Sequence, residues 1–331
     1  MLLTDPGAYV YVGPKTEGSR ALFRGTAAHN TLTVDGMDQA ESSGPFPWRT
    51  LPQVTVDLWA SNRRFDLLIA SHDGYMRLPQ PVRHRRCVFN LKSNFCVIQD
   101  LAEGTGNHTL DVAWHLAPGA NFAPLPSPEA KNSESAPAKA TGIFLPLCCD
   151  GLAIISASQQ NWMAQTGEYS YSPVYGSRVQ ALKLVHRWEG KLPASLATIL
   201  APVTANALFA LKFTRLASLQ KDGCDACELR DGRDVHRLWI AGAPRTWQWK
   251  DLETDARLFY RGASAAGTEA LILCGASFAK LSGKLLFQLD QPMSWLEATL
   301  HDLPRLDCSD PAISGSEEAV LAVLRELFAA V

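Results

Sequence analysis

Hydrophobic and polar residues alternate along most of this chain in short runs, which is the pattern of half-buried β-strands. The run at 54–60 (VTVDLWA) is a clear example. Asp-Gly pairs suited to tight turns recur between such runs, at positions 35, 73, 150 and 231. The pattern predicts strands at 8–12, 31–34, 54–60, 67–70, 86–90, 96–100, 109–116, 142–147, 153–157, 181–188, 194–200, 208–213, 234–240, 257–260, 269–273 and 284–289. We therefore expect an all-β protein, a large antiparallel sandwich with mostly local hairpins.

Helical spacing occurs at the end of the chain. Ser314 and Glu317 form a capping-box pattern, and apolar residues from Val320 onward share one helical face. This predicts one helix at about 317–328. We expect a sandwich at 1–313, with a soft break near 220–233, followed by the C-terminal helix at 314–331. The Pro- and Ser-rich stretch 118–141 is expected to be an exposed insertion.

Composition narrows the possible partners. The 331 residues carry a net charge of −2, so bulk electrostatics favours neither nucleic acid nor an anionic membrane. No apolar run is long enough to span a bilayer, and Met1 is not followed by a signal-peptide pattern. The eight cysteines are expected to be buried thiols or loop residues. Cys224 and Cys227 form a CxxC in a polar stretch, but a second pair at zinc-ribbon spacing does not follow.

Two residues near the start of the chain have metal-ligand chemistry. His29 comes just before the predicted strand at 31–34, and Asp5 opens an earlier Asp-Pro-Gly turn. A histidine and an aspartate on adjacent strands supply half of a zinc site. We expect their side chains to lie close enough for one ion to touch both. The alternatives are a turn role for Asp5 and a strand-end role for His29.

The residues around this pair resemble a known family. The stretches 5–9 (DPGAY), 24–31 (RGTAAHNT) and 34–39 (VDGMDQ) are similar to the C-terminal β-sandwich part of the heparinase II/III-like polysaccharide lyases. Shorter matches follow in the family's order at 44–48 (GPFPW), 72–75 (HDGY), 84–86 (HRR), 99–100 (QD) and 114–116 (WHL). These matches lie within roughly the first 120 residues.

The resemblance implies a lyase that cleaves uronic-acid-containing polysaccharide by β-elimination. Family members pair an N-terminal helical toroid with this sandwich, and substrates include glycosaminoglycans or alginate. By motif position, Asp5 and His29 correspond to zinc ligands. The catalytic tyrosine, the carboxylate neutraliser and a His-x-His-x-Asp strand are expected upstream of Met1, so no catalytic residue is assigned here. The chain is expected to be inactive without a toroid partner, and the family implies a periplasmic or cell-envelope location.

Several arginines and histidines are further candidates for contacts with a sugar. Arg24 is the favoured contact for a uronate or sulfate, because a guanidinium fork matches such groups. His84, Arg85 and Arg86 cannot all reach one sugar, since adjacent strand residues point to opposite faces. His115 is expected to be structural. The alternative to a lyase part is a non-catalytic β-sandwich module that binds acidic polysaccharide or is purely structural.

Overall fold

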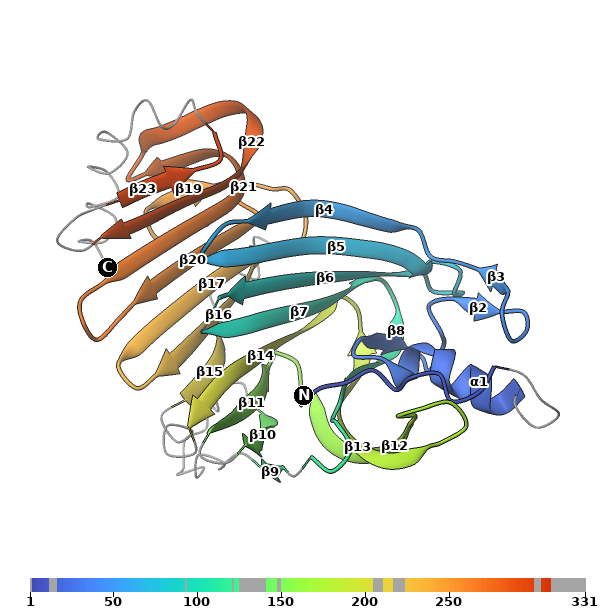
Figure 1. Ribbon diagram of the computed structural model, residues 1–331. Coiled ribbons are helices and arrows are strands. Elements are labelled where there is room, and N and C mark those ends of the chain that lie inside the picture. Colours follow the sequence, from blue (N-terminus) through green and yellow to red (C-terminus); the bar gives the residue numbers. More distant parts are fainter. Residues whose placement is uncertain are drawn as a thin grey trace. The chain divides into compact units, whose positions relative to one another are not determined.

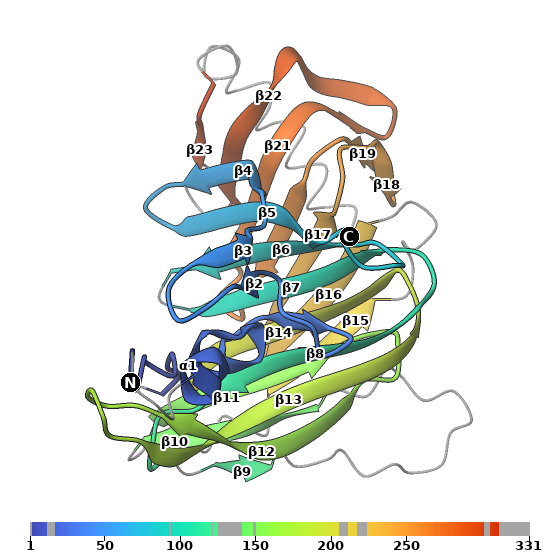
Figure 2. The same cartoon turned by 90° about the vertical axis from the view of Figure 1, so that its right-hand side faces the viewer.

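The computed structural model describes residues 2–11, 17–92, 94–120, 122–124, 141–147, 150–204, 211–216, 224–300 and 305–310. It is an all-β protein built from antiparallel sheets (Figures 1 and 2), and 65% of the described residues lie in strands and 4% in helix. The chain divides into two compact units. The first unit comprises Met1–Asp57 and Ile69–Ala205, and the second comprises Leu58–Leu68 and Asn206–Val331. None of the helices in the described part of the chain has the length and apolar character needed to cross a bilayer.

The first unit holds a short helix and two main sheets. Its elements are α1 (Glu17–Arg24), the 3-10 helix η1 (Thr26–Ala28), β1 (Leu32–Val34), β2 (Glu41–Ser42), β3 (Trp48–Thr50), β6 (Val82–Leu91), β7 (Phe95–Gly104), β8 (Asn107–His115), β9 (Ala123–Pro124), β10 (Thr141–Leu147), β11 (Asp150–Ala157), β12 (Met163–Tyr171), β13 (Val179–Lys191) and β14 (Ala194–Thr204). The long strands β4 (Val54–Ser61) and β5 (Phe65–Tyr75) contribute residues to both units.

Apolar side chains from the two sheets of the first unit form one core. One sheet has the strand order β1-β8-β13-β12, and the other has the order β4-β5-β6-β7-β14-β11-β10-β9. Leu110, Val112 and Trp114 alternate along β8 and pack with Ile98 of β7 and Leu184 of β13. Burial of such side chains from both sheets is what holds a β-sandwich together.

The second unit is built on one large sheet. Its strands are β15 (Leu211–Leu216), β16 (Cys224–Asp231), β17 (Asp234–Ala241), β18 (Trp247–Trp249), β19 (Leu252–Thr254), β20 (Leu258–Ala263), β21 (Glu269–Leu281), β22 (Lys284–Leu300) and β23 (Arg305–Cys308). The strand order is β15-β16-β17-β20-β21-β19-β18, and β22 pairs with both β21 and β23. Aromatic residues fill its core, where Trp239 and Phe259 stack with ring centroids 4.9 Å apart.

The expected fold class is confirmed, whereas some local predictions are wrong. Residues 8–11 form no strand, because Tyr9 has a φ of 57°, which breaks an extended backbone. Cys224 and Cys227 are buried, which agrees with the expectation of buried thiols, but the polar stretch that holds them is the strand β16 and not a loop. Helix α1 was not predicted. The predicted helix at 317–328 and residues 125–140 of the predicted insertion lie outside the described residues, so the predicted domain limits stay a prediction.

Candidate functional site

Asp5 and His29 form a direct pair at the start of the first unit. The Nδ1 atom of His29 lies 2.6 Å from Oδ2 of Asp5, and the two side chains are 39% and 68% exposed. Asp5 is held by its turn, because its Oδ1 accepts a hydrogen bond from the Gly7 amide at 3.3 Å. Gly7 has a φ of 80°, and a Cβ there would collide with the Ser172 carbonyl oxygen. The expected approach of the two side chains is confirmed.

This contact fixes the chemistry of the His29 ring. A carboxylate can only accept, so Nδ1 of His29 carries a proton, and in the neutral ring Nε2 keeps its lone pair. Asp5 therefore orients the imidazole, in the way a carboxylate orients a proton-transferring histidine. Since both side chains are substantially exposed, the Nε2 lone pair is suited to a ligand or to proton transfer.

Asn30 connects this pair to a buried histidine on β8. The Asn30 amide donates to the Thr4 carbonyl at 3.1 Å, and its Oδ1 accepts from the His115 backbone at 2.6 Å and from His115 Nδ1 at 3.1 Å. The His115 ring packs edge-on against Tyr169, with centroids 4.6 Å apart. Burial, followed by the charges of Lys183 and His29, lowers the pKa of His115 to about 4. His115 is therefore neutral near pH 7 and fits its expected structural role.

A chain of hydrogen bonds links Gly74, His72, His84 and Asp100 in the first unit. The Gly74 amide donates to His72 Nδ1 at 3.2 Å, His72 Nε2 lies 3.1 Å from His84 Nδ1, and His84 Nε2 lies 2.7 Å from Asp100 Oδ1. Because the Gly74 amide can only donate, His72 must carry its proton on Nε2, and His84 must then carry its proton on Nε2 as well. Both histidines are neutral in this arrangement. Burial lowers the pKa of His72 to about 4.

Arg86 links this hydrogen-bond chain to the surface pair. Its guanidinium donates to both carboxylate oxygens of Asp100, at 2.8 and 3.0 Å, and to the Asn30 carbonyl at 2.7 Å. Burial alone would raise the pKa of Asp100, but the Arg86 charge and the bonds from His84 and Arg86 lower it to about 2. Asp100 is thus a buried anion that fixes the backbone next to His29.

The sequence analysis missed this hydrogen-bond chain, although a signal for part of it was present. His84 and Arg86 are two residues apart on β6, so they share one face, and Asp100 lies opposite Arg86 on β7. Arg85 points to the other face, where it pairs with Asp57 and with Glu103. The prediction that these three residues cannot all reach one ligand agrees with this geometry.

Arg24 lies at the end of α1 and binds a neighbouring loop. It donates to the carbonyls of Gly44, Pro45 and Phe46 at 2.9, 2.7 and 3.1 Å, and its guanidinium lies 4.0 Å from the centre of the Trp48 ring. These contacts give Arg24 a structural role in holding the loop. Its contact with a uronate or sulfate stays a prediction.

The described residues contain no group of three or more His, Cys, Asp or Glu side chains arranged to hold a metal ion. Asp5 and His29 supply one oxygen and one nitrogen donor, both of types that zinc accepts. Zinc sites in proteins use three or four protein ligands. The pair therefore fits zinc in chemistry but not in number.

Three comparisons with known proteins bear on this geometry. The family model described as heparinase II/III-like, C-terminal, matches residues 1–188. A heparin-sulfate lyase of Bacteroides stercoris is 27% identical over 121 residues, which cover 36% of this chain and 16% of that protein.

Solved structures resemble this chain in fold. The heparan sulfate lyase HepC of Pedobacter heparinus superposes with a TM-score of 0.57 at 17% identity, covering 74% of this chain and 35% of that one. A heparinase III structure gives a TM-score of 0.56 at 14% identity and covers 72% and 34%. The chain thus spans about a third of the solved proteins and about a sixth of the curated relative. Because the family model covers more than half of the 331 residues, the chain belongs to the heparinase II/III-like C-terminal family.

Proposed function

We propose that this chain is the sandwich part of a polysaccharide lyase that cleaves uronic-acid-containing polysaccharide by β-elimination, and that it is inactive without a helical toroid. The family match supports the reaction class. The single structural observation that carries the proposal is the exposed Asp5–His29 pair, which lies within the matched residues. Glycosaminoglycans are the first substrates to test, because the curated relative is named a heparin-sulfate lyase; alginate is the second. A periplasmic or cell-envelope location forms part of the proposal.

β-Elimination sets requirements that this chain meets only in part. The proton next to a uronate carboxylate is weakly acidic until the developing charge is stabilised. The reaction therefore needs a neutraliser for the carboxylate, a base for the proton and an acid for the leaving oxygen. In the proposal, a toroid supplies the neutraliser and a tyrosine, while this chain supplies His29 at the edge of the site. The buried Asp100–Arg86–Asn30 connection holds the backbone beside His29 in place.

The test of this proposal is a fusion protein. The part of the Pedobacter heparinus lyase outside the matched region is joined to the start of this chain, and heparan sulfate and alginate are offered as substrates. We expect unsaturated uronate to form, measured by its ultraviolet absorbance, and we expect formation to be lost when His29→Ala is introduced. A fusion that folds, as judged by cooperative thermal unfolding, but leaves both polymers intact would contradict the proposal.

Zinc binding by Asp5 and His29 is also part of the proposal, with further donors from outside the described residues. Bound zinc would hold the Asp-Pro-Gly turn against His29. We expect the isolated chain to bind zinc weakly, and both Asp5→Asn and His29→Ala to abolish saturable binding in a calorimetric titration. The matched control is Asp35→Asn, which alters another aspartate that pairs with a histidine, 2.8 Å from the buried His108. Equal zinc binding by all four proteins would exclude a site at Asp5 and His29.

A further inference from the structure

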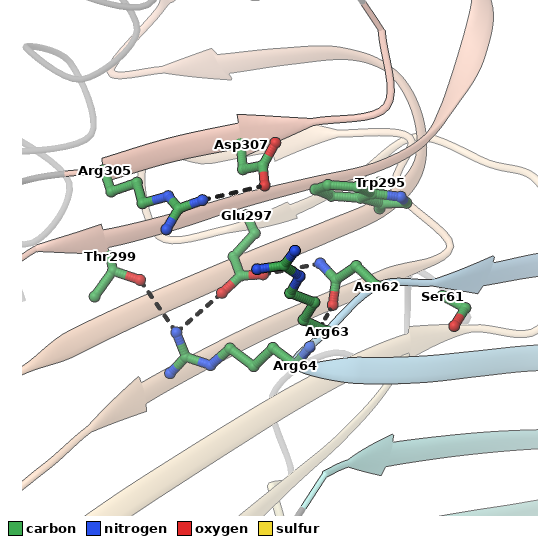
Figure 3. Close-up of a pocket in the computed structure, with 9 residues that line it drawn as sticks. All are labelled: Ser61, Asn62, Arg63, Arg64, Trp295, Glu297, Thr299, Arg305 and Asp307. Atoms are coloured by element: carbon green, nitrogen blue, oxygen red, sulfur yellow. Dashed lines mark hydrogen bonds and ion pairs between the residues drawn. The ribbon is translucent and has the colours of Figure 1, made fainter.

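The second unit contains a pocket far in sequence from the Asp5–His29 pair. Its volume is about 730 Å³, within the range of roughly 300–1,000 Å³ that is usual for small-molecule sites. Figure 3 shows that its side chains come from the turn between β4 and β5 and from β22 and β23. The lining residues are Ser61, Asn62, Arg63, Arg64, Trp295, Glu297, Thr299, Arg305 and Asp307.

The floor of the pocket is the polar face of two paired strands. Trp295, Glu297 and Thr299 are two residues apart along β22, so they share one face. Arg305 and Asp307 of β23 lie directly opposite Thr299 and Glu297. The intervening residues Leu296, Ala298 and Leu306 belong to the core on the other face. The strand alternation therefore fixes which side chains line the pocket.

The wall of the pocket is a well-ordered turn. The Asn62 side chain accepts hydrogen bonds from the amides of Arg64 and Phe65 at 2.8 and 3.0 Å, which shapes the turn. Phe65 is buried and packs edge-on against Trp295, with ring centroids 6.3 Å apart. These contacts attach the turn to β22, so Arg63 and Arg64 are held at the pocket in advance of any ligand.

The charges in the pocket leave one cation in excess. Both oxygens of Glu297 are already engaged, by Arg64 at 3.0 Å and by the Asn62 amide at 2.9 Å, and its side chain is only 15% exposed. Asp307 has Arg305 at 3.8 Å. Three arginines thus face two carboxylates, and Arg63 is exposed and forms no ion pair with any described residue. An anionic ligand would neutralise this excess positive charge.

We propose that this pocket binds an acidic saccharide unit of a polysaccharide, at a site separate from Asp5 and His29. Arg63 and Arg305 would bind a carboxylate or sulfate through charge-assisted hydrogen bonds. The half-buried Trp295 would provide an apolar surface for the sugar ring. The choice of an acidic saccharide rests on the proposed function, whereas the anionic character of the ligand follows from the arginines.

The test uses the full chain in calorimetric titrations at low salt, because exposed charges are screened as salt is raised. The probes are a heparin hexasaccharide, an alginate hexasaccharide and the neutral maltohexaose. We expect the first two to bind, and the tighter one identifies sulfate or carboxylate as the preferred group. Arg63→Ala should weaken binding roughly tenfold and Arg63→Ala with Arg305→Ala more strongly, since one charged hydrogen bond is worth about a factor of ten.

The matched control is Arg233→Ala, an exposed arginine in the turn between β16 and β17 of the same unit, outside the pocket. The affinity of this variant for the acidic probes should stay within about twofold of that of the parent chain, because the variant removes the same charge outside the pocket. Equal losses in Arg63→Ala and Arg233→Ala, equal binding of maltohexaose, or no binding of either acidic probe would each overturn the pocket proposal. The lyase proposal is tested separately by product formation in the fusion protein, which these titrations do not measure, so the two proposals can fail independently.

Discussion

Replacing Asp100 with asparagine is expected to lower the free energy of unfolding by about 3–5 kcal/mol, the usual cost of removing one partner from a buried ion pair. The Asp100 side chain is only 1% exposed, and it accepts two bonds from Arg86 and one from His84. Asparagine has nearly the same shape but no charge, so the variant leaves the Arg86 guanidinium without its counterion. Urea unfolding followed by tryptophan fluorescence measures the difference.

The control for this prediction is a second arginine–aspartate pair in the same unit. Asp111 accepts two bonds from Arg187, at 2.8 and 2.7 Å, but the Arg187 side chain is 49% exposed. Exposed pairs contribute about 0–1 kcal/mol, because water solvates both partners when the pair is broken. Asp111→Asn should therefore lower the free energy of unfolding much less than Asp100→Asn does. Similar costs for the two variants would mean that burial of the Asp100 charge does not determine its contribution.

The same carboxylate gives the stability a defined pH dependence. The folded-state pKa of Asp100, about 2, lies below the value near 3.9 of an unfolded aspartate. A lowered pKa contributes stability that is present above pH ~4 and is lost as the pH falls from ~4 towards ~2. The difference in the free energy of unfolding between the parent chain and Asp100→Asn should therefore decrease as the pH falls from ~4 to ~2.

The fold class could be predicted because it depends on local pattern. Alternating residues predict a half-buried strand, and the predicted strand at 67–70 lies within β5, whose side chains alternate between buried and partly buried positions. Local pattern fails where the backbone departs from the extended form, as at Tyr9, whose positive φ ends an otherwise strand-like run. Strand pairing is a long-range property, and the alternation does not encode it.

The candidate site could be predicted only where a motif was known. Asp5 and His29 were paired by their ligand chemistry and by the family resemblance, and their contact is confirmed at 2.6 Å. Predicting the hydrogen bond from His84 to Asp100 requires the register of β6 against β7, which cannot be read from the sequence. The pocket was not predicted at all, because Arg64 and Glu297 are separated by 233 residues and no pattern relates them.

The chain alone is expected to show no measurable lyase activity. Tyr169 is connected to the Asp5–His29 pair through His115 and Asn30: it packs on His115, and its hydroxyl donates to the Leu116 carbonyl at 2.7 Å. Burial, followed by the charge of Tyr171, raises the pKa of Tyr169 to about 12. A hydroxyl that is protonated at neutral pH and already committed to a carbonyl is a poor base, so Tyr169 does not replace a toroid tyrosine.

The expected loss of reaction rate in the chain alone follows from the two catalytic contributions assigned to the toroid. A positioned general acid–base contributes ~10²–10⁴-fold, and a charge-stabilising donor contributes another ~10²–10³-fold. The measurement is ultraviolet absorbance of unsaturated uronate after incubation of the purified chain with heparan sulfate and with alginate. Turnover that disappears in His29→Ala would show that these 331 residues contain a complete active site. In that case His29, with its proton fixed on Nδ1 by Asp5, would be the first candidate for the base, because its Nε2 lone pair is available to accept the substrate proton.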